Sequence, residues 1–199
     1  MSLEGTASCR GLDGLPAVVA RAVAGARRAG FELSCRPAHG RLLSVLAGGI
    51  GDGTIGETGT GCGVGLAWLA SGASPGAKLV SVERDPAGAA AAREVFAGEP
   101  RVTLLEDDWT ALERHAPFDL LSLDGGGQGK RGDPPIDPLV WLRPGGLLVM
   151  DDFTPSEAWP PTYAGAVDEV RLMWLTHPLL LATEIRTEPG LCAIVARRR

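Results

Sequence analysis

The residues of this chain best suited to do chemistry are acids at the ends of short apolar runs. They are Glu57, Glu83, Asp108, Asp124, Asp151 and Asp152. The carboxyl ends of parallel strands share one edge of a sheet, so these carboxylates are expected to line one crevice. A helix N-cap or a turn is the simpler interpretation of any single acid among them. Their joint recurrence at strand ends favours a shared site.

A glycine-rich segment lies between the first and second of these acids. Gly59, Gly61 and Gly63 alternate with Thr60 and Cys62, directly after a short predicted strand. Glycine tolerates positive φ and has no Cβ, so such a loop can turn tightly and bring bare backbone against a ligand. Glu83 follows Gly63 by 20 residues, where a carboxylate can accept hydrogen bonds from both ribose hydroxyls. The pattern predicts a nucleoside-cofactor site, against the alternative of a plain strand-to-helix turn in a chain with 28 glycines.

The spacing argues against a dinucleotide. The fingerprint G-x-G-x-x-G/A needs a third small residue, and the three possible frames place Val64, Leu66 or Trp68 there. Pyrophosphate binding is poorly supported. An NAD-dependent oxidoreductase stays as the weaker alternative, because Glu83 would serve an NAD ribose equally well.

The order of elements predicts an α/β fold. Strands are expected at residues 54–58, 79–83, 102–105, 118–123 and 147–150, and helices at 15–29, 37–47, 64–70, 86–96, near 110–114 and just before 142. A helix at 164–175 and two strands, 179–186 and 191–196, follow. This alternation indicates a Rossmann-like, doubly wound, mostly parallel sheet with an antiparallel C-terminal hairpin. We expect one domain over residues 1–199, with residues 1–50 forming helices that precede the sheet.

The net charge and the lack of long apolar stretches limit the kinds of partner that this chain is expected to bind. A net charge of −5 argues against nucleic acid as the main partner, and no apolar stretch approaches the roughly 20 residues that a membrane span needs. The first residues lack the features of a signal peptide, so a cytoplasmic location is expected. The four cysteines are scattered, which indicates reduced thiols rather than disulfides or a zinc site.

The pattern E-x-G-x-G-x-G, from Glu57 to Gly63, resembles motif I of the class I S-adenosylmethionine-dependent methyltransferases. The resemblance implies a seven-stranded sheet and a loop whose residues Glu57, Gly59, Thr60, Gly61 and Gly63 meet the amino-acid end of the cofactor. It also implies that Asp108 and the adjacent amide of Trp109 meet the adenine. The Trp109 ring could cover the adenine or belong to the core.

Two later segments, 118–124 and 142–153, resemble the metal-site segments of the catechol and caffeoyl-CoA type O-methyltransferases. Carried over, the metal ligands are Asp124, Asp151 and Asp152, with Asp124 also a catalytic and cofactor-binding residue. Three carboxylates suit Mg²⁺ first, and Ca²⁺ or Mn²⁺ as alternatives. Residues 36–43 resemble the segment that precedes motif I, which puts Ser34 and Cys35 near the methionine portion of the cofactor.

The chain departs from that family at one position. The family has a lysine base three residues after the first metal aspartate, where this chain has Gly127. Lys130 could reach into the site from its loop, but the preferred interpretation is an ordinary exposed lysine, so the base stays unidentified. His39 is the one histidine near the expected site.

The family implies transfer of a methyl group to a hydroxyl of a small, aromatic molecule, assisted by a divalent cation. A metal-independent methyltransferase, with Asp124 or Asp152 as base, and a non-catalytic cofactor-binding protein are the alternatives. A homodimer is possible, but nothing in the residues demands it.

Overall fold

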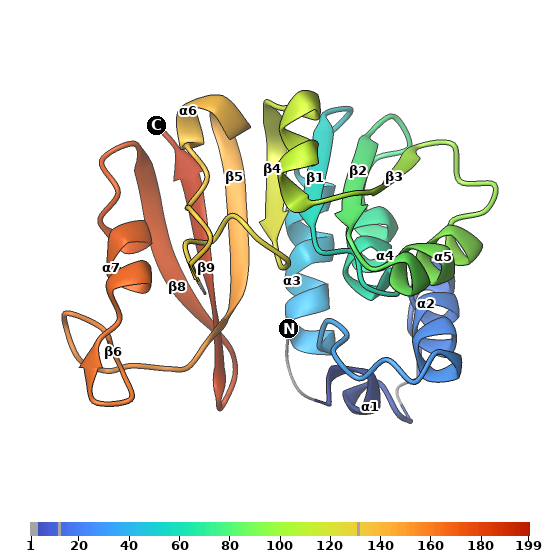
Figure 1. The fold of residues 1–199 in the computed structure, drawn as a ribbon, viewed down its shortest axis with the longest axis horizontal. Helices are drawn as coiled ribbons and strands as arrows, with labels where there is room; N and C mark the ends of the chain where they lie inside the picture. Colours follow the sequence, from blue (N-terminus) through green and yellow to red (C-terminus); the bar gives the residue numbers. More distant parts are fainter. Residues whose placement is uncertain (1–3, 12, 131) are drawn as a thin grey trace.

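A single seven-stranded sheet organises the computed structural model, which describes residues 4–11, 13–130 and 132–199. Its order is β3-β2-β1-β4-β5-β9-β8, with β3 and β8 at the two ends (Figure 1). The strands are β1 (Thr54–Thr58), β2 (Lys78–Glu83), β3 (Val102–Glu106), β4 (Phe118–Leu123), β5 (Leu142–Phe153), β8 (Leu180–Glu188) and β9 (Leu191–Arg198). The first five are parallel, and β9 runs antiparallel to both β5 and β8. The predicted fold class is confirmed.

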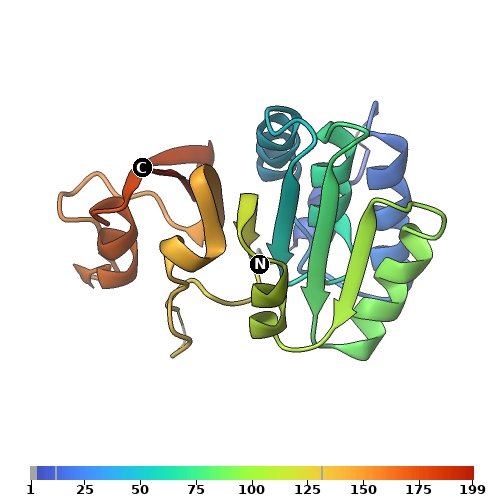
Figure 2. The same ribbon diagram turned by 90° about the horizontal axis from the view of Figure 1, so that it is seen from above.

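Helices cover both faces of the sheet. They are α1 (Gly5–Ser8), α2 (Ala17–Arg28), α3 (Pro37–Gly48), α4 (Val64–Gly72), α5 (Pro86–Val95), the 3-10 helix η1 (Trp109–His115), α6 (Pro138–Trp141) and α7 (Glu169–Leu175). One core packs α2, α3 and α4 on one face, and a second packs η1, α6 and α7 on the other. Viewed from above, α2 and η1 lie on opposite sides of strands β1 to β3 (Figure 2).

Local signals explain where the helices begin. Pro37 and Pro86 stand in the first turns of α3 and α5, where the missing N–H costs nothing. Asp85 accepts from the Gly88 N–H at 2.9 Å, and Asp168 accepts from the Arg171 N–H at 3.1 Å. These aspartates satisfy N–H groups that the helix itself cannot pair. The predicted bounds of α3 and α5 are therefore within one residue of the observed ones.

The C-terminal third departs from the prediction. The helix expected at 164–175 begins only at Glu169, because Ala164 and Gly165 have φ of 49° and 83° and turn a small hairpin between β6 (Thr162–Tyr163) and β7 (Ala166–Val167). Strand β5 extends beyond the expected 147–150 at both ends, since Leu142 pairs with Phe118 of β4 and Phe153 pairs with Cys192 of β9. Helix α1 was not anticipated, and η1 is a 3-10 helix. Within the described residues, no helix has the length and apolar character to cross a membrane.

Candidate functional site

The glycine-rich loop adopts the conformation that its sequence predicts. Gly59, Gly61 and Gly63 have φ of 84°, 53° and 86°, a region that side chains with a Cβ rarely adopt. A Cβ on Gly59 would lie 2.5 Å from the backbone of Gly125, and one on Gly61 would lie 3.0 Å from the Phe31 ring. The loop therefore needs glycine both for its turn and for its close approach to the segment after β4.

Glu83, at the end of β2, is hydrogen-bonded to the backbone of the glycine-rich loop. Its Oε2 accepts the Gly61 N–H at 2.7 Å, and its Oε1 accepts the Asp85 N–H at 2.7 Å. Each carboxylate oxygen keeps a second lone pair for another donor. Glu83 thus lies against the glycine loop, as the predicted ribose contact requires, and also holds that loop in place.

A small cavity joins three segments that are distant in sequence. Its walls include Phe31, Cys35, Gly59, Thr60, Gly61 and Asp124. Thr60 is buried, and its hydroxyl lies 2.5 Å from the Ser81 hydroxyl. Burial, reinforced by the charges of Asp151 and Asp124, raises the pKa of the Cys35 thiol well above its ordinary value. Cys35 is therefore a neutral wall residue rather than a nucleophile.

Glu57 lies beneath the loop rather than in this cavity wall. Its side chain is 1 % exposed, and the Ser81 hydroxyl donates to its Oε2 at 2.6 Å. Burial, together with the nearby charges of Asp124 and Glu83, raises the pKa of Glu57 to about 8, while the Ser81 hydrogen bond opposes them. A Cβ on Gly65 would lie 2.5 Å from Oε1, so this glycine makes room for the carboxyl at the start of α4. The direct cofactor contact of Glu57 remains a prediction.

Asp108 and Trp109 both have roles within the fold. Asp108 caps η1 by accepting the Thr110 N–H at 3.1 Å and its hydroxyl at 2.8 Å, and these hydrogen bonds lower the pKa of Asp108. The Trp109 ring packs against Gly126, where a Cβ would lie 2.4 Å from it, and its centroid is 5.8 Å from that of Trp141. The adenine contacts of both residues remain predictions.

The three predicted metal ligands come together. Asp124, Asp151 and Asp152 each offer a carboxylate oxygen, and these oxygens lie within 4.8 Å of one another. Opposite ligands of a six-coordinate ion are about 4.2 Å apart for Mg²⁺ and up to about 5.2 Å apart for Ca²⁺, so the spacing fits a hard divalent cation. Burial, then the charge of Asp151, raises the pKa of Asp124 to about 7, although the Lys130 ammonium acts in the opposite direction. A bound cation would relieve this repulsion.

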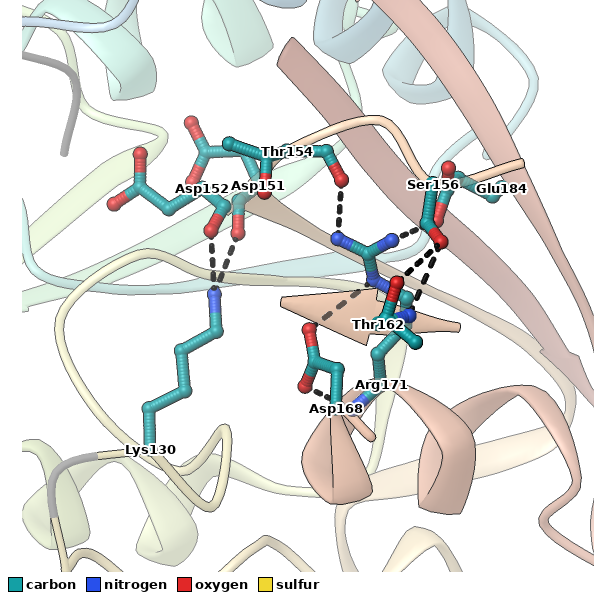
Figure 3. A network of polar contacts seen from close by, with 9 residues as sticks. All are labelled: Lys130, Asp151, Asp152, Thr154, Ser156, Thr162, Asp168, Arg171 and Glu184. Carbon is teal, nitrogen blue, oxygen red and sulfur yellow. Dashed lines mark hydrogen bonds and ion pairs between the residues drawn. The ribbon is translucent and has the colours of Figure 1, made fainter. Parts of the chain in front are cut away.

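Lys130 contradicts its sequence-based interpretation as an ordinary exposed lysine. Its side chain is half-buried, and Nζ donates to the backbone carbonyls of Asp151 and Asp152 at 3.0 Å and 3.1 Å (Figure 3). With Asp124, Asp152 and Gln128 it lines a cavity of about 130 Å³. Gly127, at the family's lysine position, has a φ of 80° and no room for a Cβ beside Ile136.

Arg171, which belongs to no motif recognised in the sequence, supports the segment after β5. Its side chain is 1 % exposed, forms ion pairs with Asp168 at 3.3 Å and Glu184 at 3.5 Å, and donates to the Thr154 carbonyl (Figure 3). His39, on α3, approaches the acidic cluster, with Nε2 3.8 Å from Asp151 Oδ2. A basic residue between apolar neighbours in α7 was the available signal for Arg171.

The comparisons with known proteins agree with this geometry. The family described as "Methyltransferase domain" matches residues 57–153, from Glu57 below the glycine loop to the residue after Asp152. A provisionally assigned O-methyltransferase of Mycobacterium avium (strain 104) is 33% identical over 122 residues, which are 57% of this chain and 54% of the relative. The chain therefore spans about half the length of the curated relatives that it matches.

Solved structures match over nearly the whole chain. Cofactor-bound Rv0187 from MTB has 26% identity and a TM-score of 0.74, over 95% of this chain and 93% of that one. An O-methyltransferase from Bacillus cereus in complex with SAH has 20% identity and a TM-score of 0.71, over 98% and 96%, and supports the fold alone. The glycine loop and the sheet order agree with these matches: residues 57–153 match the methyltransferase domain family, and the chain as a whole has the Rossmann-like fold of the solved methyltransferase structures.

Proposed function

We propose that this protein transfers a methyl group from S-adenosylmethionine to a hydroxyl of a small, aromatic molecule with the help of a divalent cation. One observation carries the proposal: the glycine loop, Glu83 and the three aspartates meet at the same edge of the sheet. A methyl donor and an activated hydroxyl must lie side by side for in-line transfer. At this edge of the sheet, the glycine loop and Glu83 offer a site for the methyl donor, and the three aspartates offer a site for the hydroxyl.

The cofactor half of the proposal rests on the loop and on the residues around it. S-adenosylmethionine supplies an electrophilic methyl group on a sulfonium. The bare backbone at Gly59 and Gly61 leaves space for the amino-acid end, and Glu83 accepts the ribose hydroxyls. Cys35, Thr60 and Asp124 line the cavity beside the loop. The cofactor held by Rv0187 supports this assignment by similarity.

The proposed role of a divalent cation depends on the cluster of three aspartates. Asp124, Asp151 and Asp152 would hold the cation, with Mg²⁺ the first choice and Ca²⁺ or Mn²⁺ the alternatives, because all three donors are carboxylate oxygens. A divalent cation bound there would lower the pKa of an acceptor hydroxyl. The aspartates orient the acceptor oxygen, and the half-buried surroundings exclude water from it.

A small acceptor fits the space beside the cluster. The cavity of about 130 Å³ against Asp124 and Asp152 is of the size that a single ring fills. Trp159 and Tyr163, on the segment after β5, are 68% and 62% exposed and do not line this cavity; we propose that these rings meet the part of a planar acceptor that extends beyond it. These features support an aromatic substrate.

A metal-independent transfer is the second candidate, and one observation favours it. The pKa of Asp124 is raised to about 7, which is near the optimum for a general base at neutral pH. Asp124 would then take the acceptor proton itself. The third alternative, a non-catalytic cofactor-binding protein, would bind the cofactor without transfer to any acceptor.

The test is methyl transfer to a panel of catechol-like acceptors, followed by mass spectrometry, in Mg²⁺ and in EDTA. Metal-assisted transfer predicts activity that EDTA abolishes, and a loss of at least a hundredfold in both Asp124→Asn and Asp152→Asn. Asp133→Asn is the matched control, because Asp133 lines the same cavity but is exposed and outside the cluster. Activity that survives EDTA but not Asp124→Asn would support the metal-independent candidate instead.

We also propose that residues 1–199 form one domain. The sheet extends from β1 to β9, and α2 packs on both α4 and α5. Limited proteolysis checks this, since a second domain would release a stable fragment. Pairing of two copies remains an expectation that light scattering can test.

A further inference from the structure

We propose that Lys130 is a positioning residue that holds Asp151 and Asp152 in the conformation in which their carboxylates converge on Asp124. The inference rests on the proposed cation site. It assigns a role to a residue that matches no motif in the sequence. Three observations carry it: the backbone conformation at Asp152, a register shift in β5, and the contacts of the lysine ammonium.

The two aspartates are neighbours on a strand, which makes their convergence unusual. Successive side chains of a strand point to opposite faces of the sheet. Here both carboxylates have oxygens within 4.8 Å of each other and of Asp124. The alternation must therefore be interrupted between Met150 and Phe153.

The structure shows that interruption. Pairing with β9 passes from Met150–Ile194 to Phe153–Cys192, which leaves one more residue on β5 than on β9. An extra residue of this kind locally redirects side chains. Asp152 also has a φ of 64°, a left-handed conformation that persists in a non-glycine residue only when its surroundings impose it.

Lys130, in the loop after β4, makes the contacts that hold Asp152 in this left-handed conformation. Its Nζ donates to two consecutive backbone carbonyls, those of Asp151 and Asp152. These carbonyls stand immediately before and after the Asp152 backbone N–Cα unit, whose φ is unusual. The same ammonium lies 3.7 Å from the centroid of the Phe153 ring, a cation–π contact. One side chain thus contacts three consecutive residues at the point where the strand is irregular. Figure 3 shows the two hydrogen bonds, to Asp151 and Asp152.

The other end of this segment is held separately. Arg171 donates to the Thr154 carbonyl and lies 5.3 Å from the Phe153 ring. Loss of the Lys130 contacts should therefore loosen residues 151–153 without releasing the rest of the loop. The expected effect is local, which keeps a Lys130 variant foldable.

Whether metal affinity rises or falls when Lys130 is replaced distinguishes a positioning role from a purely electrostatic one. An ammonium beside a cation site repels the cation, so removing it by electrostatics alone would tighten metal binding. Removing a residue that positions the ligands would weaken binding, because the carboxylates no longer converge. The direction of the change in affinity is therefore diagnostic.

The experiment measures Mn²⁺ binding by electron paramagnetic resonance for the wild type, Lys130→Met, Lys130→Arg and Lys78→Met. Lys78 is the matched control, because it is exposed at the start of β2. Positioning predicts at least tenfold weaker binding for Lys130→Met, a smaller loss for Lys130→Arg, and no change for Lys78→Met. Equal or tighter binding by Lys130→Met would overturn the inference.

Hydrogen exchange of the same proteins in EDTA provides a readout that does not depend on metal. Positioning predicts faster exchange in peptides that cover residues 150–154 of Lys130→Met, with other peptides unchanged, and partial recovery in Lys130→Arg. If the wild type binds no Mn²⁺ but this exchange pattern appears, the metal proposal fails and the positioning role stands. Unchanged exchange at 150–154 would refute the positioning role even if the wild type binds Mn²⁺.

Discussion

At the scale of single residues, the site concentrates carboxyl groups where water is scarce. Glu57 and Asp124 have pKa values raised to about 8 and about 7, in both cases chiefly by burial. Glu57 lies below the loop and Asp124 lies beside it, so they face the same region from two sides. Two carboxyls that resist ionisation at neutral pH leave a clear signature in the pH dependence of stability.

The sign of that dependence follows from proton counting for Glu57. Its ordinary pKa is 4.5 and its folded pKa is about 8, so between these values the folded state holds a proton that the unfolded state has lost. Stability is therefore fully present below about 4.5 and declines as pH rises toward about 8. Glu57→Gln removes the titration and keeps an acceptor for the Ser81 hydroxyl.

We expect urea unfolding in EDTA to show a wild-type free energy of unfolding that falls from pH 5 to pH 8. Glu57→Gln should show a clearly smaller fall, with the remaining decline due to Asp124. Parallel profiles for the two proteins would contradict the buried, protonated state of Glu57.

Gly59 provides a second prediction at this scale. Gly59→Ala places a Cβ 2.5 Å from the Gly125 backbone at a φ of 84°, so it should cost about 2 kcal/mol or more of stability and weaken cofactor binding. Gly98→Ala is the control, because Gly98 has a similar φ of 83° with nothing near its Cβ. Similar losses in stability and in S-adenosylhomocysteine affinity for both variants would show that the close approach of the two loops is unimportant.

At the scale of elements, buried parallel strands were the most predictable. Strands β1 and β4 have the predicted bounds. In β4, an apolar run that ends at an acid followed by glycines has few other interpretations, and β1 ends where the glycine-rich loop begins. The helix expected at 164–175 was wrong over its first five residues. Apolar spacing suggested a helix there, but Ala164 and Gly165 form a turn, and the N-cap is Asp168.

The site was predictable where topology alone positions a residue. Glu83, Asp124 and Asp151 end parallel strands, so the rules of sheet topology bring them to one edge. Lys130 acts through contacts with the last residues of β5, and Arg171 acts through a contact with the segment after β5. Such contacts depend on how loops pack, and neither hydrophobic periodicity nor motif spacing encodes them.

Arg171 links three elements, and its replacement tests that link. Arg171→Met leaves Asp168 and Glu184 without their buried cationic partner, so it should cost about 3 kcal/mol or more. Arg41→Met is the control, since Arg41 is exposed on α3. Chemical denaturation checks both variants, and a loss below about 1 kcal/mol for Arg171→Met would show that the network does little to hold α7 against β8.

At the scale of the whole molecule, the edge of the sheet forms the site, and the faces of the sheet form the apolar core. Its carboxyl edge gathers the cofactor loop and the acidic cluster, while the two faces bury the apolar side chains of the helices. The strongly non-local order of the strands makes this edge a property of the complete sheet. Binding of the cofactor should therefore require the intact domain and not the glycine loop alone.

The most direct test of the central claim is calorimetric titration of the protein with S-adenosylhomocysteine, with NADH as the comparison ligand. The account predicts micromolar binding of S-adenosylhomocysteine, weakened at least tenfold in Glu83→Gln, and no binding of NADH. Failure of S-adenosylhomocysteine to bind, with or without Mg²⁺, would contradict the assignment of the glycine loop and Glu83 to this cofactor.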